Sequence, residues 1–272
     1  MDIFHVFLVY VLVYVLNHKI ISKIGLKVNA NKGNLVNIWR FLCYPWLMII
    51  INFKDYDEAT GENARKLAAI FEKIVAAAEV AIAVHPTDLR LVAGVVDKLL
   101  LFSQSGDFCS RNSDGTLKKT QNGRMTPNII KKIGCKGILV NHAENPRSDD
   151  EIRLTVEDFR RECPDVRIVV CAESVERGER ILEICGKNKP DFIAVELPEM
   201  IGGDISVTTK PEVVKNAVDR LEVDVLVGAG VKNSNDIAKA LMLGAKGVLL
   251  ASGVFKPKNG RMPEQVLSEL IK

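Results

Sequence analysis

Histidine and tryptophan are scarce in this sequence, which has 4 His and 2 Trp among 272 residues. The 6 cysteines form no Cys-x-x-Cys pair, so the ligand spacing of a structural zinc site is absent. The six cysteines are at positions 43, 109, 135, 163, 171 and 185, and most of them lie within or beside apolar runs. We therefore expect buried free thiols in a reducing, cytoplasmic compartment.

The sequence also lacks a block of like charges, and its formal net charge is only +3. A nucleic-acid-binding arm would need such a block, so no nucleic-acid partner is expected. Apolar residues make up 47% and charged residues 26%, which is ordinary for a globular protein. The length suits one large domain, because β/α barrels often run to about 250 residues.

A membrane-spanning run of ordinary length is missing as well. The unbroken apolar run Val6–Leu16 is shorter than the roughly 20 residues that a spanning helix needs. No Lys or Arg precedes it and no small-residue cleavage site follows it, so it does not have the features of a secretory signal. Lysines follow the run at positions 19, 23 and 27, and they would keep the rest of the chain cytoplasmic if the run entered a bilayer.

Residues 1–47 therefore have three interpretations. They form a weak membrane anchor, an extension packed on the domain, or upstream sequence that is not translated. We favour the third, because Met48 stands immediately before the first convincing core strand. Membrane contact is expected only if the segment is present and inserts. Mass spectrometry of the native amino terminus distinguishes the interpretations, since peptides from residues 1–47 would eliminate the third.

From residue 48 to 272, short apolar runs alternate with longer segments of helical period. The runs are rich in Val, Ile, Leu or Ala, as expected for strands buried on both faces of a parallel sheet. They are Met48–Asn52, Ala81–Val84, Leu99–Phe102, Gly137–Val140, Val166–Cys171, Phe192–Val195, Val223–Val227 and Gly247–Leu250. A doubly wound sheet usually stops at five or six strands, so eight units predict a closed (β/α)8 barrel, an α/β fold, over 48–272.

Helix starts can be predicted from the segments between these runs. Thr126-Pro127 and Lys210-Pro211 each place a proline at a first helical position. Thr155 with Asp158 approximates a capping box, and Ser234 is placed to cap the seventh helix.

Chemically active side chains follow three of the predicted strands. In a β/α barrel the active site lies at the carboxyl ends of the strands. Lys54 follows the first strand, His142 the fourth and Glu196 the sixth. Because alternate residues of a strand share a face, Asn52 and Lys54 are expected to project together.

Small residues follow the last two predicted strands, as Gly228-Ala229-Gly230 and Ala251-Ser252-Gly253. They allow backbone amides to approach an anion, and the loops after strands 7 and 8 are the usual phosphate site of this fold. Together with a Lys, a His and a Glu at one mouth, this pattern fits proton transfer next to a carbonyl on a small phosphate ester.

Several of these motifs resemble one known family. Asn52-x-Lys54, the Asn-His-x-Glu of Asn141–Glu144 and the Val-Glu-x-Pro-Glu-x-Ile-Gly of Val195–Gly202 are similar to triosephosphate isomerase, as are Gly228–Gly230 and Leu249–Val254. The form of the last two loops resembles the archaeal branch. The resemblance covers Met48–Lys272 and implies a TIM barrel.

The resemblance implies interconversion of dihydroxyacetone phosphate and D-glyceraldehyde 3-phosphate through an enediol(ate), in glycolysis and gluconeogenesis. As in known members of the family, Glu196 would be the base and His142 a neutral electrophile, its pKa lowered by a helix N-terminus. Lys54 would stabilise the oxyanion and the phosphate, and Asn52 would add a hydrogen-bond donor. A lid after Glu196 would close over the substrate. The phosphate would be held by backbone groups of Ile201, Gly230, Ala251 and Ser252. No metal or organic cofactor is implied.

Three features depart from the family pattern. Ala143 stands where a serine usually follows the histidine, which removes a hydroxyl that would help to seat the base, and Leu197 replaces the proline after the base. The stretch Ser105–Asn122 scarcely matches the family's third loop, which usually builds the subunit interface. The implied assembly is a homo-oligomer, a tetramer as in the archaeal branch or a dimer.

Two alternatives compete with the isomerase. One is another phosphate-binding barrel enzyme, such as one that makes an indole or thiamine precursor, although these do not usually combine Lys54, His142 and Glu196. The other is a degenerate, non-catalytic phosphate-binding barrel, which the departures at Ala143 and Leu197 suggest.

Overall fold

The structure is a computed structural model, and it describes residues 47–75, 79–118, 120–196, 210–257 and 260–271. The chain divides into two units between Leu42 and Cys43. The leading segment lies outside the described residues, so its three interpretations stay open. Within the described ranges no helix is long and apolar enough to cross a membrane.

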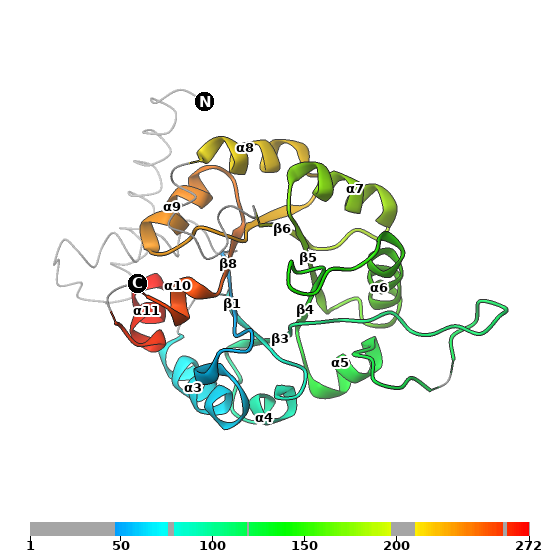
Figure 1. Cartoon of the computed structure of the whole chain (residues 1–272), viewed down its shortest axis with the longest axis horizontal. Coiled ribbons are helices and arrows are strands. Elements are labelled where there is room, and N and C mark those ends of the chain that lie inside the picture. The colour runs from blue at the N-terminus through cyan, green and yellow to red at the C-terminus, as the bar shows by residue number, and fades with distance from the viewer. Residues whose placement is uncertain (1–46, 76–78, 119, 197–209, 258–259, 272) are drawn as a thin grey trace, which may run out of the picture. The chain divides into compact units, whose positions relative to one another are not determined.

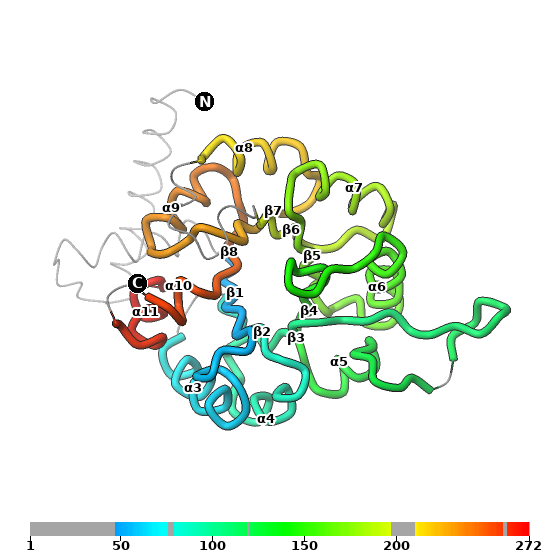
Figure 2. The backbone as a smooth tube through the Cα atoms, in the orientation of Figure 1, coloured from blue at the N-terminus to red at the C-terminus, as the bar shows by residue number. Residues whose placement is uncertain are grey.

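Eight parallel strands form a closed barrel in the order β1 to β8, as the sequence predicts. Helices surround the strands in Figures 1 and 2. The strands are β1 Met48–Asn52, β2 Glu79–Val84, β3 Leu100–Ser103, β4 Gly137–Val140, β5 Arg167–Ala172, β6 Phe192–Val195, β7 Asp224–Val227 and β8 Gly247–Leu250. Because all pairs are parallel, the carboxyl ends of the strands open at one end of the barrel.

Nine α-helices lie in the described ranges, together with a short 3₁₀ helix, η1, at Asp57–Ala59. They are α3 Gly61–Ile74, α4 Leu89–Ala93, α5 Pro127–Ile133, α6 Asp149–Glu162, α7 Val175–Cys185, α8 Pro211–Arg220, α9 Ser234–Met242, α10 Ser252–Phe255 and α11 Pro263–Leu270. The two helix starts predicted from proline are confirmed, since α5 and α8 begin at Pro127 and Pro211.

Two capping predictions are wrong. Thr155 and Asp158 lie inside α6, whose capping box is formed by Ser148 and Glu151 about two turns earlier. The cap of α9 is Asn233, whose side chain accepts hydrogen bonds from backbone amides of the first turn. Ser148 and Asn233 both have the extended backbone that an N-cap needs.

The barrel interior is filled by alternate residues of the strands, as in other closed β/α barrels. This core consists of Met48, Ile50, Ala81, Ala83, Phe102, Leu139, Val169, Cys171, Ala194, Leu226 and Leu249. The prediction of buried free thiols is confirmed for four cysteines, while Cys109 is half-buried. The buried ones are Cys135, Cys163, Cys171 and Cys185.

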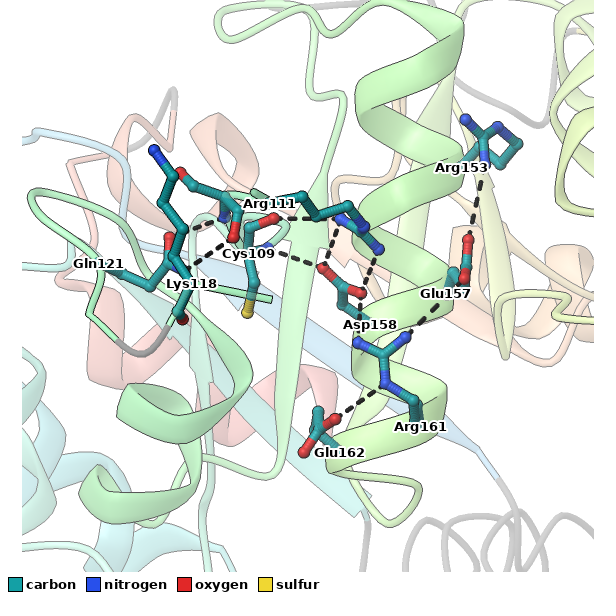
Figure 3. A network of polar contacts seen from close by, with 10 residues as sticks. Cys109, Arg111, Lys118, Gln121, Arg153, Glu157, Asp158, Arg161 and Glu162 are labelled. Atoms are coloured by element: carbon teal, nitrogen blue, oxygen red, sulfur yellow. Dashed lines mark hydrogen bonds and ion pairs between the residues drawn. The ribbon is translucent and has the colours of Figure 1, made fainter. Parts of the chain in front are cut away.

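A long connection between β3 and α5 leaves the barrel, and we call residues 107–125 the arm (Figure 1). Its outer part closes through an antiparallel bridge between Arg111 and Leu117. Figure 3 shows how it is attached to α6: Arg111 Nη2 lies 2.7 Å from Oδ1 of Asp158, and the Cys109 amide donates to Oδ2 at 2.7 Å. Asp158 is fully buried and also pairs with Arg161. The arm is therefore attached to α6 through Asp158.

Candidate active site

The three side chains predicted from the strand ends meet at the mouth of the barrel. Lys54 Nζ lies 2.7 Å from Glu144 Oε1. The other Glu144 oxygen is 3.9 Å from Nδ1 of His142. On the far side of the ring, Nε2 of His142 lies 3.5 Å from Oε1 of Glu196. An ammonium, an imidazole and a buried carboxylate thus form one continuous chain of groups.

Lys54 reaches the mouth from a position beyond the strand. We expected Asn52 and Lys54 to share a strand face, but β1 ends at Asn52 and Lys54 has a left-handed backbone with φ of 46°. The buried side chain of Asn52 stabilises this turn by accepting a hydrogen bond from the Lys54 amide at 3.0 Å. Asn52 therefore shapes the backbone that carries the lysine.

Gln104, which the sequence analysis missed, supports the same turn from β3. Its Nε2 donates to the carbonyl oxygen of Lys54 at 3.0 Å and to that of Ala83 at 3.1 Å. The only sequence signal was a polar residue directly after a buried strand, which is common at barrel mouths. A non-glycine residue at positive φ is costly, so these hydrogen bonds help to hold Lys54 in place.

The protonation of His142 follows from its neighbours. The Glu144 amide donates to Nδ1 at 3.1 Å, so Nδ1 is the acceptor and the neutral ring carries its proton on Nε2, toward Glu196. Burial lowers the pKa of His142, and the charge of Lys54 lowers it further against an opposing influence of Glu144. The helix that follows, α6, begins only at Asp149.

Glu144 links the lysine to the histidine. Burial alone would raise its pKa, but the hydrogen bond and charge of Lys54 outweigh burial and hold the pKa below its usual value. Glu144 is therefore ionised at neutral pH. It places a negative charge between the ammonium of Lys54 and the ring of His142.

Glu196 is 5% exposed at the end of β6, and burial raises its pKa to about 7. The Cys171 thiol, the charge of Lys54 and the Ala143 amide act in the opposite direction. Among the described residues, its Oε2 is buried and has no hydrogen-bond partner. A carboxylate held in this way is a stronger base than one in water.

Gly228 makes room for that carboxylate. A Cβ at this position would lie 2.4 Å from Cγ of Glu196, so any larger residue would displace the side chain. The sequence analysis assigned this glycine to a phosphate loop. The structure adds a second, steric reason for it at the end of β7.

A cavity of about 380 Å³ adjoins the glutamate on the side of β4 and β5. Ala143 and Cys171 line it together with Glu196, and Arg147 and Arg177 line it as well. The missing hydroxyl at position 143 thus leaves a methyl group in the wall beside the carboxylate.

Three of the predicted phosphate residues, Gly230, Ala251 and Ser252, lie at the same end of the barrel. Gly230 follows β7 with φ of 73°, and Ala251 precedes the short helix α10, which begins at Ser252. Ile201 and the predicted lid, including Leu197, lie outside the described residues.

Comparison with known proteins shows the family of this chain. The family model described as triosephosphate isomerase matches residues 47–271. A triosephosphate isomerase of Methanocaldococcus jannaschii is 34% identical over 83% of this chain and 99% of its own length. Those of Methanothermus fervidus and Archaeoglobus fulgidus are each 37% identical over 82% of this chain, and over 97% and 96% of their own lengths. The chain therefore belongs to the triosephosphate isomerase family.

Proposed function

We propose that this protein interconverts dihydroxyacetone phosphate and D-glyceraldehyde 3-phosphate, a step of glycolysis and gluconeogenesis. The observation that carries the proposal is the contact between Nε2 of His142 and the buried carboxylate of Glu196, 3.5 Å apart, beside the ammonium of Lys54. A base and a neutral electrophile at this separation can act on adjacent atoms of one small substrate.

In the proposed step, Glu196 removes a proton from the carbon next to the substrate carbonyl. The electrons of that C–H bond form a carbon–carbon double bond, and the carbonyl oxygen gains the negative charge. The proton on Nε2 of His142 stabilises that oxygen, and Lys54 supplies positive charge nearby. A proton then passes, through Nε2 of His142, from the hydroxyl group on the first carbon to the oxyanion, so the negative charge moves to the first oxygen. Glu196 returns its proton to the carbon of the original carbonyl, and the new carbonyl forms at the first carbon, which completes the isomerisation without a cofactor.

The phosphate of the substrate would lie between the loops after β7 and β8. Gly230, Ala251 and Ser252 would offer backbone groups there, with Ile201 from the predicted lid. Asn52 would contribute to binding chiefly through the backbone turn that presents Lys54.

The test is isomerisation in D₂O. Purified protein is given dihydroxyacetone phosphate, and the product is followed by NMR and by a coupled assay. A proton that passes through Glu196 exchanges with solvent, so the aldehyde product should carry deuterium at carbon 2. Absence of turnover would contradict the proposal. If the protein still bound phosphate esters, the degenerate-barrel alternative would replace it.

The pH dependence of kcat/KM should follow the protonation state of Glu196. Glu196 must be ionised to accept a proton, and burial places its pKa at about 7. We expect kcat/KM to fall by about tenfold per pH unit below pH 6 and to level off above pH 8. Initial rates between pH 5 and pH 9 measure this, and a profile flat down to about pH 5 would contradict a raised pKa.

Ala143→Ser should shift the fall of kcat/KM on the acidic side of the pH profile, the acidic limb, to lower pH. A hydroxyl beside the carboxylate would donate a hydrogen bond to its charged form, which lowers the pKa of Glu196. The displacement is expected to be about half a unit to one unit. Ala143→Gly is the matched control, because it changes the same position without adding a donor and should leave the limb in place.

We further propose that the protein is a cytoplasmic homo-oligomer, a tetramer or a dimer, and that the arm contributes to its interface. The arm projects from the barrel in Figure 1 and is attached to α6 through Asp158. Analytical ultracentrifugation of the full chain tests this, and a monomer at micromolar concentration would contradict it.

A further inference from the structure

The connection between β4 and α6 carries His142 and is closed on itself by Asn141. This residue has φ of 59°, a left-handed conformation that asparagine adopts more readily than most residues. Its Nδ2 donates to the carbonyl oxygen of Cys171 at 2.9 Å, which fixes the start of the connection to β5. Its Oδ1 accepts a hydrogen bond from the Arg147 amide at 2.9 Å, which joins the end of the connection to its start.

The side chain of Arg147 continues outward from this closed connection to the base of the arm. Its Nη2 lies 3.0 Å from Oδ1 of Asp107. The other oxygen of Asp107 accepts from the Met125 amide at 2.7 Å, and the Asp107 amide donates to the Met125 carbonyl at 2.9 Å. Asp107 thus joins the two ends of the arm to each other and to the loop that carries the histidine.

Both partners of this ion pair are mostly buried, with side-chain exposures of 22% for Arg147 and 12% for Asp107. A pair screened from water in this way restrains its neighbours more than a surface pair does. The imidazole accepts a hydrogen bond from the Glu144 amide at Nδ1, and the backbone of His142 is held in a turn in which the Asn145 amide donates to the His142 carbonyl at 2.7 Å.

We propose that Asp107 and Arg147 are positioning residues whose ion pair holds the 141–147 connection, and with it the imidazole of His142, at its distance from Glu196. The proposal rests on the isomerase function proposed above. Without the pair, the end of the connection keeps the hydrogen bond of the Arg147 amide to Asn141 and the contacts at the start of α6, where Arg147 Nη1 lies 3.8 Å from Oε1 of Glu151. A displacement of about 1 Å at a reacting group can cost about 100-fold in rate, so a partial displacement should be visible in kcat.

Asp107→Asn is the first variant. It keeps the shape of the side chain and an acceptor for the Met125 amide, but removes the charge that pairs with Arg147. We expect kcat to fall about tenfold and KM to stay within about twofold, because the phosphate site is untouched. In ¹⁵N spectra, the Nδ1 signal of His142 should broaden or shift as its hydrogen bond to Glu144 weakens.

Asp191→Asn is the matched control. Asp191 also accepts from a backbone amide, that of Ile168 at 2.6 Å, and pairs with an arginine, Arg160, at 2.8 Å. It precedes β6, so it lies at the opposite end of the barrel from the mouth. This variant should lower the melting temperature as much as Asp107→Asn does, with kcat within about twofold of wild type.

Arg147→Gln provides a second variant should Asp107→Asn fail to fold. If the pair acts as a unit, Arg147→Gln alone and the double variant should lose no more activity than Asp107→Asn alone. Arg147→Lys should recover part of kcat. The inference is overturned if kcat stays within twofold in both single variants, or if their losses multiply in the double variant. Lack of turnover by the wild type would refute the proposed function itself, which is a different result.

Discussion

Glu196→Gln is expected to lower kcat by about 10²–10⁴-fold with little change in KM. The amide has almost the shape of the carboxylate but cannot accept a proton, so the substrate still binds and the transfer step is lost. A coupled assay at pH 8, where the wild-type base is ionised, measures the effect. Turnover that survives the substitution unchanged would exclude Glu196 as the base.

The same substitution should make the protein more stable at pH 8. The folded-state pKa of Glu196 is raised from 4.5 to about 7, so the native protein holds this proton more tightly than the unfolded chain does. Stability linked to this group is therefore present at pH 4 and lost as the pH rises through 7. Removing the charge should raise the melting temperature at pH 8 and leave it nearly unchanged at pH 4.

Glu173→Gln is the control for both effects. Glu173 lines the same cavity but is exposed. Its replacement should leave kcat within about twofold of wild type and the melting temperature within about one degree at both pH values. A loss of activity as large as that of Glu196→Gln would mean that charge in the cavity, rather than the base, controls the rate.

Gly247→Ala is expected to have the largest effect on folding. A Cβ at this position would lie 2.0 Å from the backbone oxygen of Met48, where β8 pairs with β1 and closes the barrel. Backbone on both sides is fixed by strand pairing, so neither chain can move aside cheaply. We expect the free energy of unfolding to fall by about 3 kcal/mol or more, with insoluble protein as the extreme result.

Urea unfolding followed by circular dichroism measures this loss, and Gly94→Ala is the control. At Gly94 the nearest atom to an added Cβ is 3.8 Å away and φ is −76°, which any residue adopts. That variant should be neutral or stabilised by up to about 1 kcal/mol. A Gly247→Ala protein as stable as wild type would show that the seam between β1 and β8 is looser than the structure indicates.

The sequence by itself determined the strands, two of the helix starts and the positions of the chemically active side chains. These features depend on residues close together in the chain: a buried strand needs a short apolar run, and a proline favours the first turn of a helix. Because parallel strands bring their carboxyl ends to one mouth, the convergence of Lys54, His142 and Glu196 could also be predicted.

Only the tertiary structure decided how those groups are held. Gln104 reaches Lys54 across 50 positions of the chain, and Lys54 pairs with Glu144 across 90. Contacts of this kind depend on the register in which eight strands close and on the backbone turns that follow them, neither of which leaves a local pattern. The same applies to the ion pair of Asp107 with Arg147. Closure of the barrel sets these distances, and with them the burial that raises the pKa of Glu196.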